Sequence, residues 1–152
     1  MDLLTQYDIP YFHPLVVHFP VAMLSAALVF ALLWAIRGHA RWLTVYVSMH
    51  FIGTLGAIAA FRTGEALKED TEGVPIVEEL VETHELYGKI TMIIAICVSL
   101  ILLYVLYSRS KKQPWSDGRS IRILIVILAL CTAAITALAA HAGGIMVWGI
   151  PA

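Results

Sequence analysis

Four predominantly apolar segments, each at least twenty residues long, restrict this 152-residue chain more than any other feature. They are Leu15–Ile36, Trp42–Phe61, Leu86–Tyr107 and Ile121–Ala140. About 20 residues of α-helix, each rising about 1.5 Å, cross the hydrocarbon core of a bilayer. Only 14% of the residues are charged, against about a quarter in soluble domains. The sequence therefore predicts an all-α integral membrane protein, a four-helix bundle that forms a single domain.

The expected helices cover about residues 14–36, 42–63, 84–107 and 121–142. Between the second and third spans lies a long polar loop, which Gly73 and Pro75 interrupt. After Pro75, apolar side chains recur at helical spacing between glutamates. This pattern predicts a short amphipathic helix over about residues 76–84 that runs into the third span.

The charged residues are divided unequally between the two ends of the predicted spans. Seven of the ten Lys and Arg residues lie in the loops over residues 37–41 and 108–122, together with one acid, Asp117. The other ten acids lie in the N-terminal segment and in the loop over residues 62–85. Because basic loops stay in the cytoplasm, both termini are expected on the periplasmic side. We therefore expect a multi-pass protein of the bacterial inner (cytoplasmic) membrane.

Five of the six histidines lie in or at the ends of the apolar segments. An ionisable residue in a membrane span is costly and is by default a candidate for a functional site. Four of the five lie within roughly two turns of the outer boundary, on three different segments. These four are His13, His18, His84 and His141. The fifth, His50, lies near the membrane midplane.

Neutral imidazole is the usual axial ligand of haem iron, and four-helix bundles hold such cofactors between facing helices. A b-type haem with two axial histidines needs them on different helices at similar depth, and His18 and His84 form the best such pair. Gly88 lies on the same helix face as His84, where it leaves room for a flat ring. Arg62 and Lys89 lie near the outer boundary, where haem propionates would favour cations.

His13 and His141 form a second set in this interpretation. They would supply a second haem's ligands, a hydrogen bond that supports the first pair, or the lining of a quinone pocket. The sequence contains no CxxCH, which excludes covalent c-type attachment.

Two other classes of function stay open. Imidazole also binds copper and zinc, so the same four histidines would suit a periplasm-facing metal site. A non-catalytic accessory or scaffold subunit would dock partner helices through a stripe of small residues on the second span. The stripe consists of His50, Gly53, Ala57, Ala60 and Gly64. The short basic loops are explained by membrane orientation and anionic lipid, so no nucleic-acid partner is expected.

The segment HPLVVHFPVAML, which begins at His13, resembles the first-helix pattern of a widespread family of uncharacterised bacterial four-span membrane domains of unknown function. Further matches are Thr63-Gly64, His84 and Gly143-Gly144. The resemblance covers nearly the whole chain. It implies a cytochrome-b-like or redox-associated membrane protein with His13, His18 and His84 as the functional set.

These observations together favour electron transfer through one non-covalent haem b, with a second haem or a quinone as further cofactors. The expected setting is a subunit of a respiratory complex rather than a stand-alone enzyme. Its partners would be other membrane or periplasmic redox subunits and lipid, in a homo- or hetero-oligomer.

Overall fold

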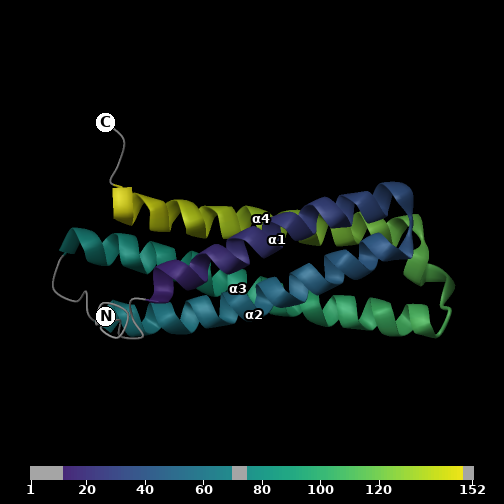
Figure 1. Ribbon diagram of the computed structural model, residues 1–152, viewed down its shortest axis with the longest axis horizontal. Coiled ribbons are helices and arrows are strands. Elements are labelled where there is room, and N and C mark those ends of the chain that lie inside the picture. The colour runs from purple at the N-terminus through teal and green to yellow at the C-terminus, as the bar shows by residue number, and fades with distance from the viewer. Residues whose placement is uncertain (1–11, 70–74, 149–152) are drawn as a thin grey trace, which may run out of the picture.

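The computed structural model describes residues 12–69 and 75–148, which form a bundle of long helices (Figure 1). Within these ranges the α-helices are α1 (His13–Arg37), α2 (Ala40–Glu69), α3 (Pro75–Ser110) and α4 (Arg119–Trp148). A short 3-10 helix, η2 (Pro114–Asp117), precedes α4. All four α-helices are long and apolar enough to cross a membrane. The predicted fold class, an all-α bundle with four membrane spans, is confirmed for the described residues.

The four helices run alternately up and down, and each packs against two neighbours. α1 contacts α2 and α4, and α3 contacts the same two helices, so α1 and α3 face each other across a diagonal. Figure 1 shows the start of α1 and the end of α4 at the same end of the bundle. We call this end, which contains His13 and His84, the histidine end. The opposite end, which contains Arg109 and Arg122, is the basic end.

The helices extend further than the apolar segments alone indicated. α2 continues to Glu69 and α4 continues to Trp148. The amphipathic stretch expected over residues 76–84 belongs to α3, which begins at Pro75 and runs without a break into the span. Lys68 Nζ and Glu85 Oε2, 2.6 Å apart, join the two helices beyond the apolar segments.

Buried side chains differ between the two halves of the bundle. Toward the basic end, an apolar core joins all four helices. Its fully buried large members are Trp34, Leu43, Tyr46, Leu102 and Ile125. Toward the histidine end from His50, every described buried residue is Gly, Ala, Ser or Thr, apart from Pro20, Leu24 and Val98. The half of the interior that leads to the histidine end therefore contains mostly small side chains, several of which carry hydroxyl groups.

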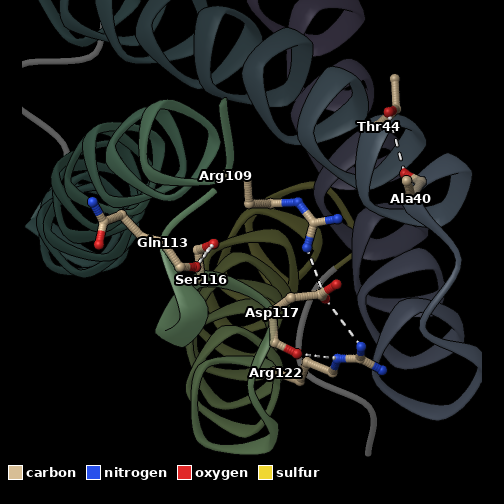
Figure 2. A network of polar contacts seen from close by, with 7 residues as sticks. All are labelled: Ala40, Thr44, Arg109, Gln113, Ser116, Asp117 and Arg122. Carbon is tan, nitrogen blue, oxygen red and sulfur yellow. Dashed lines mark hydrogen bonds and ion pairs between the residues drawn. The ribbon is translucent and has the colours of Figure 1, made fainter. Parts of the chain in front are cut away.

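Charges tie the helices together at the basic end (Figure 2). Asp117 Oδ1 lies 2.7 Å from Arg109 Nη1 and 3.0 Å from Arg122 Nη2. The two guanidinium groups also lie against the ring of Trp34, at 6.0 and 5.7 Å from its centre. These contacts link the end of α1 to the connection between α3 and α4, so the basic end is closed by its own side chains.

The two-residue connection from α1 to α2 fits closely under this network. Gly38 ends α1 with φ of 69°, a left-handed conformation, and its N–H donates to the Trp34 carbonyl at 2.8 Å. A Cβ atom added at Gly38 would lie 2.6 Å from Arg122 Nη1. Glycine is required here by backbone conformation and by the guanidinium group above it.

Candidate functional site at the histidine end

Two imidazole rings meet across the diagonal of the bundle at the histidine end. His13 begins α1 and His84 lies in α3, and their ring centres are 6.0 Å apart with an interplanar angle of 82°. The backbones of α1 and α3 make no contact of their own among the described residues. The two side chains therefore bridge a space that the helices leave between them.

The ring of His84 is held by α4. Its Nδ1–H donates to the Ala139 carbonyl at 2.9 Å. A Cβ atom at Gly143, one turn further along α4, would lie 3.0 Å from His84 Cε1. The absence of a side chain at Gly143 thus lets the imidazole lie directly on the α4 backbone. Because a carbonyl can only accept, Nδ1 carries the proton, and in the neutral imidazole Nε2 then keeps its lone pair.

The ring of His13 is held by α2 in a matching way. Its Nδ1 lies 3.0 Å from the Thr63 hydroxyl oxygen. That hydroxyl in turn donates to the Ala59 and Ala60 carbonyls, at 3.0 and 3.1 Å. Since the Thr63 proton is used in these bonds, its oxygen accepts from His13 Nδ1–H. Both imidazoles of the pair therefore present Nε2 as the free, unprotonated nitrogen.

Gly64 leaves room for the ring of His13, as Gly143 leaves room for the ring of His84. A Cβ atom at Gly64 would lie 2.9 Å from His13 Cε1. Each ring of the pair thus rests on one glycine and bonds through one Nδ1–H. Metal-binding histidines characteristically donate their second ring N–H to a carbonyl or another acceptor, which fixes the tautomer and the direction of the ring.

His18 lies apart from this pair. It is exposed, and its Nδ1–H donates to the Pro14 carbonyl one turn earlier in α1. Together with Phe19, Leu55 and Gly56 it lines a groove of about 620 Å³ on the outside of the bundle, between α1 and α2. Because His13 and His18 are five residues apart, they point in different directions from one helix. The ring that meets His84 is that of His13, not the His18 ring that the sequence favoured as its partner.

The other predicted site residues are spread over the same end and the midplane. His141 is exposed, and so are Arg62 and Lys89. Arg62 pairs with Glu65 at 3.4 Å. A Cβ atom added at Gly88 would meet nothing within 4 Å, so the space beside it is open. No group of three or more His, Cys, Asp or Glu side chains that could hold a metal ion occurs in the described parts of the chain.

His50 is the one buried histidine of the interior, with 1% of its surface exposed. Its Nε2–H donates to the Ala95 carbonyl at 3.2 Å, and its ring lies 5.7 Å from that of Tyr46. The small-residue stripe that begins at His50 packs inside the bundle. At Gly53, for example, an added Cβ would lie 2.7 Å from Leu24 Cδ2. Gly53 and Gly64 of the stripe thus face α1, whereas His50 contacts α3.

A comparison with known protein families gives a match over nearly the whole chain. The family described as "Predicted membrane protein (DUF2231)" matches residues 10–151. The chain belongs to this family. In this DUF2231 protein, five of the residues that carried the resemblance lie together: His13 rests on Gly64, His84 rests on Gly143, and Thr63 holds His13. No curated protein and no solved structure matches the chain.

Sequence reasoning had not given the four supporting residues a role in the site. Thr63 and Gly143 entered only as matches to the family, Gly64 also as part of the small-residue stripe, and Ala139 contributes nothing but a backbone carbonyl. Their positions could have indicated this role. Thr63 and Gly64 lie at the outer end of the second apolar segment, and Ala139 and Gly143 at the outer end of the fourth, at the depth of His13 and His84.

Proposed function

We propose that this protein transfers electrons through a non-covalent b-type haem at the histidine end, which His13 and His84 would hold. The observation that carries the proposal is the pair itself, two imidazoles from diagonal helices with both Nδ1 atoms engaged. With metal–nitrogen bonds of about 2 Å, two imidazoles on opposite sides of one metal ion have ring centres roughly 6 Å apart. The 6.0 Å separation fits that requirement.

The number of donors favours haem over a bare metal ion. Zinc sites in proteins use three or four protein ligands, and no third candidate joins the pair among the described residues. Haem brings four nitrogen ligands of its own and needs only two from the protein. When bound, the haem supplies an iron that takes up and releases single electrons. The chain contributes the two Nε2 lone pairs, the glycines beneath the rings and, through Arg62 and Lys89, cations for the propionates.

The groove beside His18 is the proposed place for a quinol as electron donor. Of the residues that line it, His18 alone can titrate, and its Nε2 is left as an acceptor because Nδ1–H donates to Pro14. A quinol needs such an acceptor for its hydroxyl group and an apolar channel for its tail. The electrons would leave to a second redox subunit.

The basic loops support an orientation for this electron transfer. With the basic end in the cytoplasm, the histidine end faces the periplasm of a bacterial inner membrane. Single cysteines at Ser110 and Glu65, both exposed and at opposite ends, test this in whole cells. A membrane-impermeant maleimide should modify E65C in intact cells and S110C only after lysis. Modification of S110C alone in intact cells would reverse the orientation.

The decisive experiment is the optical spectrum of the protein purified from haem-supplemented cells. We expect a Soret band and a sharp α-band on reduction, both abolished by His13→Ala and by His84→Ala. His141→Ala is the matched control, since this exposed histidine lies at the same end but outside the pair. Normal spectra in both variants would refute the proposed ligands. A colourless protein with bound copper or zinc would favour the metal site, and one with neither would favour the scaffold subunit.

Quinone binding has a separate readout. A photoreactive azidoquinone should label the peptide that contains Leu15–Phe19, and His18→Phe should reduce the labelling several-fold. His141→Phe should leave it unchanged. Equal labelling of the two variants would show that His18 does not hold the quinone head group, whatever the spectrum of the haem.

A further inference from the structure

His50 lies in the middle of the bundle, far from either end. An ionisable side chain at such a depth is unusual. His50 is fourteen residues along α2 from Gly64, which contacts His13, and this spacing corresponds to about 21 Å along the helix. Its side chain is almost fully buried. Because ionisable residues inside a membrane are costly, a histidine kept at this depth marks a function by default. The electron-transfer site described above does not use it.

The surroundings of His50 are polar on one side. The Ala95 carbonyl accepts its Nε2–H, so its Nδ1 carries the lone pair. The Thr54 hydroxyl lies 3.0 Å from that of Ser99 and 2.8 Å from the carbonyl of His50 itself. A cluster of buried hydroxyl groups thus joins α2 and α3 around the imidazole, in the middle of the membrane-spanning region.

More hydroxyl groups continue from this cluster toward the histidine end. Thr91 lies one turn before Ala95 in α3, and Thr132 and Thr136 are buried in α4. The two α4 hydroxyls donate to carbonyls four residues back. Thr91 Oγ1, by contrast, is buried with no hydrogen-bond partner among the described residues. A buried polar atom without a protein partner generally binds an ordered water molecule, because lipid hydrocarbon offers it no hydrogen bond.

Toward the basic end the same interior is closed. Leu102 and Ile125 are fully buried beside Tyr46, and Trp34 and Leu43 fill the next layer. The Tyr46 hydroxyl also has no partner among the described residues, and neither has Trp34 Nε1 in the core toward the basic end. The other large members of this core, Leu43, Leu102 and Ile125, are apolar and offer no hydrogen bond to a water molecule.

We propose that a file of water molecules connects His50 to the histidine end, and that this file ends at Tyr46. His50 is then a proton-accepting site that exchanges protons with one side of the membrane only. Thr91 and the hydroxyl groups of α4 line the path, and the apolar core seals it from the opposite side. The inference does not depend on haem binding, because it rests on different residues.

Solid-state NMR tests the water file without any structural change. In lipid bilayers, the 15N signals of histidine-labelled protein should receive polarisation from water at His50, as they do at the exposed His39. His50→Phe identifies the signal by removing it. If His39 responds and His50 does not, the interior is dry and the proposal is overturned.

The direction of access is tested with silver ions, which are small, charged and reactive toward thiols. The background replaces Cys97 and Cys131, both exposed on the outside of the bundle, by alanine. Silver added on the side of the histidine end should protect Thr91→Cys from maleimide after denaturation, and silver on the other side should not. Val105→Cys is the control, because Val105 lies in the same helix and is equally buried in the apolar core.

Each result of the silver experiment decides the question. Protection of T91C from the histidine side alone, with V105C unprotected from both sides, supports the one-sided path. Failure to protect T91C would overturn the path, and equal protection from both sides would overturn its closure. The haem spectrum of T91C should stay normal, so that loss of the path and loss of the proposed haem site are told apart.

Discussion

At the basic end, charged and aromatic side chains contact one another across the bundle. At the histidine end, the imidazole rings of His13 and His84 meet, and each lies against a glycine. Asp117 forms ion pairs with both Arg109 and Arg122 at the basic end, so these charged groups contact one another within the chain. The histidine pair instead has both Nδ1 atoms bonded and both Nε2 atoms free. Groups that are held firmly but left with an unused lone pair are suited to a ligand.

The interior repeats this difference. Large side chains fill the basic half, and they stabilise the bundle by close packing. Small and hydroxyl-bearing residues fill the histidine half, where burial of apolar area is smaller. The large packed side chains and the histidine pair thus lie in different halves of the bundle. Variants at the two ends should accordingly change different measurements.

The largest effect is expected from the glycines beneath the rings. Gly143→Ala places a Cβ 3.0 Å from His84 Cε1 and displaces the ring, so haem affinity should fall about 100-fold, the upper range for groups that orient a ligand. Gly144→Ala, in the next position of α4, meets nothing within 4 Å and should leave the affinity unchanged. Haem titration of both variants measures this. Equal affinities would show that the rings do not need the α4 surface.

Gly38→Ala should produce the largest effect at the basic end. The left-handed conformation costs an L-residue about 1–2 kcal/mol, and the new Cβ would also press on Arg122. The free energy of unfolding in detergent should fall by at least about 1 kcal/mol, while the haem spectrum stays unchanged. Gly118→Ala is the control, because Gly118 has φ of −67° and its nearest contact is 3.4 Å away. An altered spectrum in G38A would contradict the separation of the ends.

Thr63→Val removes the acceptor of His13 Nδ1–H and keeps the shape of the side chain. The ring of His13 then loses its fixed direction, and haem affinity should fall about tenfold. Thr63→Ser, which retains the hydroxyl, should restore most of it. The two dissociation constants provide the measurement, and a T63S variant as weak as T63V would point to packing of the methyl group instead.

The smallest effect is expected for Asp117→Asn. Because the Asp117 side chain is 47% exposed, its ion pairs are screened, and the stability should fall by only about 1 kcal/mol. The difference from the unaltered protein should shrink in high salt. Thermal unfolding at two salt concentrations tests this, and a loss that is independent of salt would mean that the charges are not the cause.

Much of the fold was predictable from the sequence because burial in a bilayer leaves a direct trace in composition. Four long apolar segments dictate four helices, and short connections dictate their alternating direction. The sequence also predicted an amphipathic helix that runs into the third span, and α3 begins at Pro75, directly after the interruption that Gly73 and Pro75 indicate. The ion pair of Lys68 with Glu85 shows how these outer turns are held outside the apolar region.

The candidate site was predictable in its residue types but not in its pairing. Counting residues places His13, His18 and His84 at similar depth, but depth says nothing about direction around a helix. The helix turn of about 100° per residue separates His13 from His18, and the packing of α1 on α2 decides which of them faces inward. Gly64 settles this choice, because it admits the ring of His13 against α2.

Length and hydropathy alone predict the membrane-spanning helices, their number in the described chain and the depth of each histidine. That His13 meets His84, that His18 faces an outer groove and that the interior changes character at His50 became visible only in the packed bundle. A one-dimensional pattern records how far a residue lies along a helix, whereas contact depends on how four helices rotate against one another.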